Sequence, residues 1–163
     1  LERHGEHEAA ARARRLGRSS ALGVETVLPG PVGERNVYTL HPRGHILLRP
    51  ATEAGLQAQM AAVLATGNTG KIEGITLPAG LPPRVAAAFA ASDQPFAGVL
   101  VEGDATRIAA TIREVAEWPG AIVPVHAASS EALDWCCDRL LEEVSISINT
   151  TAAGGNASLM MIG

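Results

Sequence analysis

The chain has 163 residues, of which 47% are hydrophobic, 18% charged and only 3% aromatic. This length and composition favour one packed domain with a single core and exclude a disordered chain. The formal net charge of -4 excludes the basic footprint of a nucleic-acid-binding protein. No apolar stretch approaches the roughly 20 residues that cross a bilayer. The two cysteines are adjacent in the sequence, so we expect a reducing compartment and no structural disulfide.

The N-terminus is charged and lacks a methionine, beginning Leu1-Glu2-Arg3-His4. We therefore expect no signal peptide, and we expect the chain to be excised from a longer protein. The pattern then predicts a helix over residues 5–17 that ends near Gly17. Its arginines alternate with alanines and follow several glutamates, which is typical of a solvated helix face.

Three β-rich segments follow this helix. Residues 24–28 predict a short strand that ends at Pro29-Gly30-Pro31. Residues 36–40 and 45–49 are separated by a Pro-x-Gly turn, so they predict a β-hairpin over 36–49. The residues that we single out in this hairpin are Asn36, Tyr38, Leu40, Ile46 and Leu48.

From residue 53 onward, helical and strand patterns alternate. Helices are expected at 53–65, at 82–91, after the capping residue Asp104 and at 130–141. Strands are expected at 69–75, 97–101, 121–125 and 144–148. The alternation predicts βαβ units and therefore an α/β fold, a Rossmann-like domain of three layers. The proline at 124 places its strand near an edge of the sheet.

The hairpin at 36–49 and the strand at 144–148 do not fit this alternation, so we expect them to pair as a protruding antiparallel β-flap. We accordingly divide the chain into an α/β domain over residues 1–143, which includes the hairpin, and a flap strand with a docking segment over 144–163. The tail from residue 150 ends in Leu159-Met160-Met161-Ile162. It is too apolar for a solvated tail, and we expect it to dock.

Known catalytic and ligand-binding motifs are absent from the sequence. The run Gly67-Asn68-Thr69-Gly70 follows a helix rather than a strand, so it predicts a turn and no dinucleotide fingerprint. Cys136 and Cys137 lie on an apolar stripe without a neighbouring base, so at least one is expected in the core. The five histidines lack the spacing of a metal site. We therefore expect no catalytic, cofactor-binding or metal-binding residues.

Three segments in chain order resemble one known family. They are SISINTTAAGGNASLMMIG at residues 145–163, LPGPVGERNVYTL at 28–40 and LATGN at 64–68. Each is similar to a segment of the long bacterial proline utilization A (PutA) proteins, and the similarity runs from about residue 20 to the last residue.

This resemblance implies a parent enzyme that uses FAD and NAD to oxidise proline to glutamate. Its proline dehydrogenase and pyrroline-5-carboxylate (glutamate-semialdehyde) dehydrogenase sites are joined by a tunnel. The chain is then a non-catalytic domain related to the aldehyde dehydrogenase superfamily, and its partners are the catalytic domains of the parent. The resemblance also implies a cytoplasmic location, with peripheral association of the parent with the inner membrane.

The resemblance further implies that the flap and the final segment stabilise the dehydrogenase and seal the tunnel. The residues expected to dock or seal are Asn149, Thr150, Thr151, Gly154, Gly155, Asn156, Leu159, Met160 and Ile162. The two glycines allow a close approach of the backbone to its partner. The alternative is that the tail packs on its own domain as a strap.

Two hypotheses of other classes stay open. One is an NAD-binding fragment of an aldehyde dehydrogenase, in which a lysine after the Gly-Asn-Thr turn holds the adenosine ribose. The matching position here is Glu73, of opposite charge, and Lys71 lies two residues earlier and is expected on the other face, so the sequence argues against NAD. The other is an oligomerisation module that self-associates through the edges of the flap.

Overall fold

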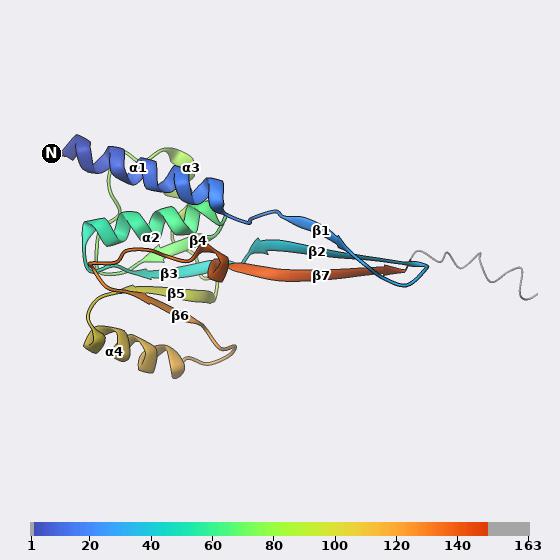
Figure 1. The fold of residues 1–163 in the computed structure, drawn as a ribbon. Helices are drawn as coiled ribbons and strands as arrows, with labels where there is room; N and C mark the ends of the chain where they lie inside the picture. Colours follow the sequence, from blue (N-terminus) through green and yellow to red (C-terminus); the bar gives the residue numbers. More distant parts are fainter. Residues whose placement is uncertain (1, 150–163) are drawn as a thin grey trace, which may run out of the picture.

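The computed structural model describes residues 2–149, which form a parallel sheet of four strands and a projecting antiparallel sheet of three (Figure 1). In chain order the elements are α1 (Glu2–Ser19), β1 (Glu25–Leu28), β2 (Glu34–Pro42), β3 (His45–Arg49), α2 (Glu53–Ala65), β4 (Thr69–Ile72), α3 (Pro83–Ala88), β5 (Phe96–Glu102), α4 (Ala105–Ala116), β6 (Val125–Ala128), the 3-10 turn η1 (Cys137–Leu140) and β7 (Leu141–Asn149). Of these helices, none is both long and apolar enough to cross a membrane.

The parallel sheet has the order β4-β3-β5-β6 and forms the centre of a three-layer body. Helix α2 lies on one face of the sheet with α1 beside it, and α4 lies on the other face (Figure 1). Ile46 and Leu48 of β3 pack in the core on the α2 side, whereas Leu47 packs with Val99 and Val115 on the α4 side. The predicted Rossmann-like α/β fold is therefore confirmed.

Capping side chains fix the starts of the two long helices of the body. The Thr52 hydroxyl accepts a hydrogen bond from the Gly55 amide, and α2 begins at residue 53 and ends at 65, as predicted. The Asp104 carboxylate accepts one from the Arg107 amide and caps α4, also as predicted. On α4, Val115 is buried, whereas Ile112 is 47% exposed.

The antiparallel sheet has the order β1-β2-β7 and extends away from the body (Figure 1). Strand β2 is its centre and pairs with β7 over nine positions, from Glu34 opposite Asn149 to Pro42 opposite Leu141. Strand β1 pairs with the other side of β2. The predicted pairing of the segment 36–40 with the strand 144–148 is therefore confirmed. β1 corresponds to the strand predicted at 24–28, but the sequence did not indicate that this strand belongs to the flap.

The predicted hairpin over 36–49 is wrong. Strands β2 and β3 belong to different sheets, and the short link between them carries the chain from the flap into the body. Gly44 makes this link with a φ of 131°, a conformation that favours glycine. Ile46 and Leu48 are consequently core residues with no exposed surface. The reason lies in the run 46–48, which is apolar on both faces, as a covered parallel strand requires.

The predicted helix over 130–141 is also wrong. The segment is extended up to the short turn η1, and Leu141 already begins β7. Trp135 and Cys137 are buried while Cys136 between them is exposed, which is the alternation of an extended chain. Leu133, Cys137 and Leu140 match a helical stripe equally well, so the spacing alone was ambiguous.

The strand expected at 121–125 begins four residues later, at Val125. Pro124 has no amide to donate, but its carbonyl accepts from the Val99 amide at 2.9 Å, just before the paired residues begin. Ile122 is 98% exposed. The expected edge position is confirmed, because β6 is the outermost strand beside β5.

Candidate functional site

One face of the antiparallel sheet is apolar and open to solvent in the described part of the chain. Val27, Val37 and Ile146 lie opposite one another across the three strands, so their side chains share a face. Val144 and Ile148 flank Ile146 at the same face of β7. Val27 is 59% exposed, Ile146 45% and Ile148 44%, whereas Val37 on the central strand is buried, with 7% exposed. We call these five residues the apolar flap face.

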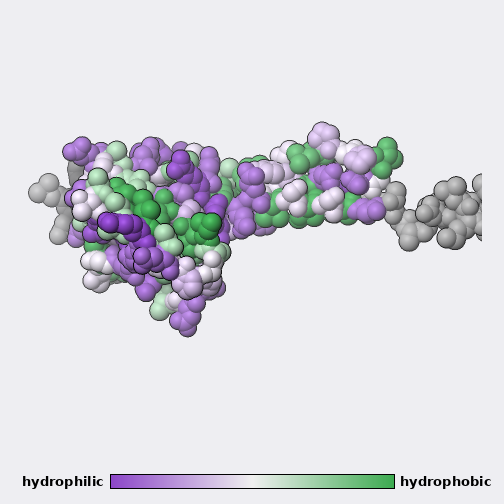
Figure 2. All heavy atoms as spheres, turned by 90° about the horizontal axis from the view of Figure 1, so that it is seen from below, coloured by the Kyte–Doolittle hydropathy of each residue, from purple (hydrophilic) through white to green (hydrophobic). Residues whose placement is uncertain are grey.

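Little on this face compensates for the exposed apolar surface. Glu25 and Arg35 form an ion pair at 3.8 Å on the same face, but both side chains are more than half exposed, so the pair contributes little stability. Val32, in the turn between β1 and β2, is fully exposed. Figure 2 shows hydrophobic residues along the projecting sheet, interspersed with hydrophilic ones. A sheet normally buries its apolar face against another layer, and within the described residues no such layer covers the exposed side chains of this face.

The opposite face of the flap is anchored to the body at its root. A groove of about 580 Å³ lies there, lined in part by Tyr38, Leu40, Arg43 and Glu143. Burial raises the pKa of Tyr38, and a hydrogen bond to the Glu143 carboxylate and its charge raise it further. Arg43 donates to the Leu141 carbonyl at 3.3 Å. This polar face therefore contacts the body at its root, whereas the apolar flap face carries partly exposed side chains.

The residues singled out from the sequence fall into four groups. Asn36, Tyr38 and Leu40 lie on β2, within the flap as expected. Ile46 and Leu48 lie in the body and do not belong to the flap. Asn149 is the last residue of β7, at the far end of the flap. The remaining docking residues, Thr150, Thr151, Gly154, Gly155, Asn156, Leu159, Met160 and Ile162, lie outside the described residues.

The carboxyl edge of the parallel sheet, where such folds bind ligands, carries a network of charges. Arg49 at the end of β3 donates to both carboxylate oxygens of Glu114 at 2.6 Å and to Glu73 at 3.0 Å. The hydrogen bonds to Glu114 raise the pKa of Arg49, and Arg49 in turn lowers the pKa of Glu114. The guanidinium is mostly buried, with 16% of the side chain exposed. It therefore joins β3, the end of β4 and α4.

Glu73 stands where the aldehyde dehydrogenase pattern has a lysine, and its carboxylate is engaged by Arg49. Lys71 also reaches it, with Nζ 3.7 Å from a carboxylate oxygen of Glu73. The expectation that Lys71 points to the other face is therefore wrong, as the two-residue period of a strand requires. The group that would face an adenosine ribose is thus a carboxylate tied to two cations of the chain itself.

The two cysteines have different environments. The sequence predicted that at least one of them lies in the core, which is confirmed for Cys137. Cys137 is buried, and burial raises the pKa of its thiol, which disfavours the reactive thiolate. Cys136, the residue before it, is exposed. Among the described residues, no three His, Cys, Asp or Glu side chains gather closely enough to hold a metal ion.

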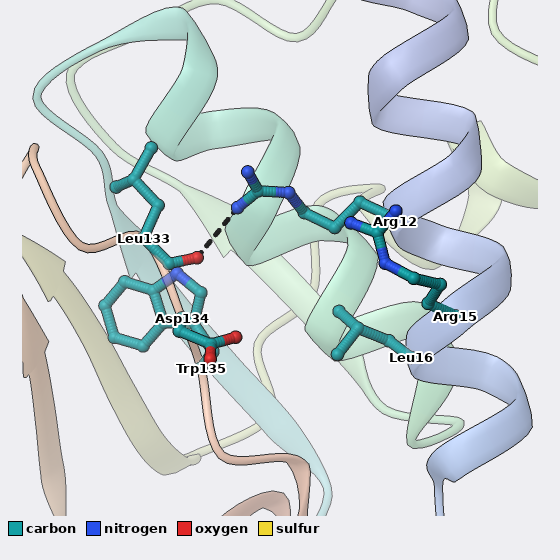
Figure 3. A pocket seen from close by; sticks show the side chains of 6 residues that line it. All are labelled: Arg12, Arg15, Leu16, Leu133, Asp134 and Trp135. Atoms are coloured by element: carbon teal, nitrogen blue, oxygen red, sulfur yellow. Dashed lines mark hydrogen bonds between the residues drawn. The ribbon is translucent and has the colours of Figure 1, made fainter.

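A cavity of about 230 Å³ separates α1 from the extended segment 133–135 (Figure 3). Arg12 of α1 crosses it and donates to the Leu133 carbonyl at 2.8 Å. Leu16 lines the cavity from the same helix, and Trp135 closes it from the body. The cavity is the seam along which α1 attaches to the body, and Arg12 is its polar link.

Sequence reasoning missed the charged residues of the parallel sheet. Arg49 follows three buried residues and precedes Pro50, and Glu102 ends the apolar run of β5. A charged residue at the carboxyl end of a buried strand was the available signal, because such a group needs a partner. Its partners lie on other elements, so the spacing within one segment could not identify them.

Comparison with known proteins gives a consistent assignment, although no family model matches the chain. The chain is 54% identical over 165 residues to the bifunctional protein PutA of Rhizobium meliloti, a match covering 93% of this chain and 14% of that protein. It is 39% identical over 151 residues to the bifunctional protein PutA of Salmonella typhimurium, covering 86% of this chain and 11% of that protein. The chain thus spans a small part of these relatives.

Solved structures agree with the sequence relatives. A mutant of Bradyrhizobium japonicum PutA, 26% identical, matches 72% of this chain and 15% of its own length with a TM-score of 0.52. Bacillus cereus aldehyde dehydrogenase matches 75% of this chain and 29% of its own length with a TM-score of 0.50, and its 18% identity supports the fold alone. The chain is therefore homologous to a segment of the bifunctional proline utilization A (PutA) proteins and shares the fold of PutA and aldehyde dehydrogenase structures.

Proposed function

We propose that this chain is a non-catalytic docking domain of a PutA enzyme, and that its flap covers the tunnel between the two dehydrogenase sites. The single observation that carries the proposal is the apolar flap face, which is exposed on a sheet that extends away from the body. The catalytic domains of the parent supply the missing layer. FAD and NAD bind those domains, and the substrates are proline and the semialdehyde formed from it.

The carboxyl edge of the parallel sheet supports a non-catalytic role. Glu73 is held by Arg49 and Lys71, so no cation is presented to a nucleotide at this position. The buried thiol of Cys137 has a raised pKa and suits a core position. We accordingly place the reactions of proline oxidation in the rest of the parent, in the cytoplasm.

The tail from Asn149 continues the docking surface in this proposal. Strand β7 ends with Asn149 at the far end of the flap, and the proposed docking residues follow it in the sequence. Leu159, Met160 and Ile162 then bury against the catalytic domains, each contributing roughly 1.5–3 kcal/mol when fully buried. Gly154 and Gly155 permit close backbone approach, while Thr150, Thr151 and Asn156 supply hydrogen bonds.

A pair of matched substitutions tests the flap in the parent enzyme. Ile146→Asp places a charge on the apolar flap face, where 45% of the side chain is exposed. Ile112→Asp places the same charge on α4, where 47% is exposed. Proline-to-NADH kinetics should show a lag and escape of the semialdehyde for Ile146→Asp and none for Ile112→Asp. Equal, immediate NADH formation by both variants would refute the proposal.

Removal of residues 150–163 tests the tail separately. In the docking proposal the truncated enzyme releases the semialdehyde, which an aldehyde-trapping reagent captures during proline oxidation. If the truncated enzyme only unfolds at a lower temperature and transfers the intermediate as before, the tail is a strap on its own domain. The role of the flap is then decided by the Ile146→Asp and Ile112→Asp variants alone.

Self-association is a second candidate function, favoured by the strand order of the flap. β1 and β7 are its outer strands, so each has one backbone edge without a neighbouring strand in the described part of the chain. Light scattering on the 163-residue chain measures this, with Val27→Lys on the edge strand β1 as the test variant. A dimer that dissociates in the variant supports self-association, and a monomeric wild-type chain excludes it.

A further inference from the structure

Glu102 is a fully buried carboxylate at the carboxyl end of β5, with no exposed surface. It lies on β5 of the body, outside the antiparallel sheet. β5 lies beside β3, whereas the chain first passes from β3 to β4 on the other side. The carboxyl ends of β3 and β5 therefore form the topological switch point, the crevice in which open α/β sheets bind ligands.

Donors from the loop after β3 surround this carboxylate. One oxygen accepts from the backbone amides of Ala51, at 2.7 Å, and Thr52, at 3.0 Å. The other accepts from the Thr52 hydroxyl at 2.8 Å, and the Ser130 hydroxyl adds a further hydrogen bond. Because Thr52 caps α2, the negative charge lies at the positive end of that helix. Backbone amides at a helix N-terminus are the groups with which proteins bind phosphate and carboxylate anions.

Gly55, in the first turn of α2, is shaped to this carboxylate. A Cβ at Gly55 would overlap the carboxylate of Glu102, so no larger residue fits unless Glu102 moves. Glycine is otherwise unfavourable within a helix. The sequence thus provides both the anion, Glu102, and the space that it occupies, at Gly55, which is 47 residues earlier.

The electrostatics of the crevice fit an ionised Glu102. Burial raises the pKa of its carboxyl group, but the hydrogen bonds from Ala51, Thr52 and Ser130 outweigh burial and lower the pKa overall. The other helix that starts at this edge, α4, is capped by the carboxylate of Asp104. Arg107 of α4 donates to the Pro50 carbonyl at 3.0 Å and fastens the loop after β3. Both helix N-termini therefore already carry carboxylates of the chain.

We propose that Glu102 is an internal anion that occupies the place in which this fold would hold the phosphate or carboxylate of a ligand. Four donors and a glycine slot form the cradle, and the side chain of the neighbouring strand fills it. The crevice is thereby closed to nucleotides, and the loop after β3 is held without a ligand. This inference does not depend on the docking role of the flap.

Replacement of the internal anion by a free one tests the proposal on the 163-residue chain. Glu102→Ala empties the cradle and should lower Tm by roughly 5 °C or more. Sodium formate, compared with sodium chloride at equal ionic strength, should restore at least half of this loss with a saturable dependence on concentration. Glu102→Gln fills the cradle with a neutral amide and should show no specific response to formate, like the wild-type chain. The proposal is overturned if formate raises the Tm of Glu102→Ala no more than that of the wild type.

The glycine slot provides an independent test by a double-mutant cycle. Gly55→Ala should lower Tm in the wild-type background and have little effect, or a favourable one, in the Glu102→Ala background. Equal losses in both backgrounds would show that the slot does not serve the carboxylate. If Glu102→Ala fails to fold, amide exchange in the wild-type chain decides instead. The proposal expects the Ala51 and Thr52 amides to be strongly protected at neutral pH, and rapid exchange there would overturn it.

A nucleotide probe completes the test. NAD added to the wild-type chain should leave its Tm unchanged, because the cradle is already occupied. A saturable rise in Tm with NAD would overturn the proposal. The same rise would also support the NAD-binding hypothesis, whereas failure of the flap substitutions in the parent enzyme would leave the internal anion unaffected.

Discussion

Arg49 shows how one side chain determines the character of the carboxyl edge of the sheet. Its guanidinium is mostly buried and is stabilised by two carboxylates, Glu73 and Glu114, that come from other elements. A buried cation with such partners costs little free energy to retain. Removal of one member of the group is strongly destabilising, because it leaves the other charges uncompensated. The same ion pairs remove from the edge the free cation that a nucleotide would need.

Substitution of Arg49 should therefore be costly. We expect Arg49→Met to lower the free energy of unfolding by about 1–3 kcal/mol, since two carboxylates lose their partner. Arg113→Met is the matched control, because Arg113 is exposed and donates only within its own helix, and it should change stability by less than about 0.5 kcal/mol. Urea unfolding of both variants measures the difference. Equal effects would show that the Arg49 network contributes nothing.

Two histidines should make the chain sensitive to mild acid. Burial lowers the pKa of His45 below its ordinary 6.5, and Lys71 lowers it further. Burial lowers the pKa of His126 likewise, with added repulsion from Arg139 and Arg43. Because the unfolded chain then binds more protons than the folded one, stability is complete above about pH 6.5 and is lost as the pH falls through the lower folded pKa values.

Urea unfolding at pH 7, 6 and 5 checks this sign, with a decreasing free energy of unfolding as the expected result. His126→Gln should reduce the decrease, because it removes one of the two histidines whose pKa is lowered. Glu102 and Glu114, whose pKa values are lowered, should extend the loss of stability below pH 4.5. A stability that rises on acidification from pH 7 to 5 would contradict the assignment of neutral histidines.

At the scale of elements, the two sheets differ in how much of each strand is buried. β3 is buried from His45 to Leu48 and β5 from Gly98 to Glu102, whereas β1 is exposed along its whole length and β7 along most of it. Local stability follows burial and contact density. The flap is therefore the less stable of the two sheets in the isolated chain, although it contains the two longest strands, β2 and β7, of nine residues each.

Amide hydrogen exchange should resolve this difference in the 163-residue chain. We expect the slowest amides in β3 and β5, and faster exchange in β1 and β7, whose outer edges face solvent. The measurement is exchange followed by mass spectrometry on peptides from each strand. Protection in β1 equal to that in β3 would contradict the assignment of the flap as the weaker sheet.

The same contrast explains which elements could be predicted from the sequence. The helix over 53–65 was correct at both ends because Thr52 caps it and its apolar residues recur at helical spacing. The link between β2 and β3 was misjudged because a Pro-x-Gly turn fits a hairpin and a crossing between sheets equally well. The segment around Trp135 was misjudged because its apolar spacing fits both an extended chain and a helix. In both places the conformation depends on burial against distant parts of the chain, which the local spacing of apolar residues does not indicate.

The candidate site could be predicted in part, for related reasons. The pairing of Asn36 and Tyr38 with the strand at 144–148 followed from two segments that the α/β alternation left over. The roles of Arg49 and Glu102 could not be predicted, because their partners are distant in the sequence and no motif relates them. The resemblance to PutA indicated the docking role of the flap. The charged residues at the crevice could be identified only from the fold.

At the scale of the whole molecule, the chain combines an α/β body with a projecting antiparallel sheet, and in our proposal the sheet rather than the body binds the partner. The body has the architecture of a nucleotide-binding domain, but its own ion pairs occupy the carboxyl edge. The flap has the apolar surface of an interior layer, but it projects into solvent (Figure 1). In our proposal, the role of the chain therefore lies on its docking surface rather than at its crevice.

Hydrogen exchange of the flap in the parent PutA enzyme, compared with the isolated chain, tests this central claim most directly. The account predicts that peptides from β1, β2 and β7 exchange much more slowly in the parent, because the apolar flap face is buried there. Peptides from α4, on the far side of the body, serve as the internal reference. Flap peptides that exchange equally fast in the parent and in the isolated chain would contradict the claim.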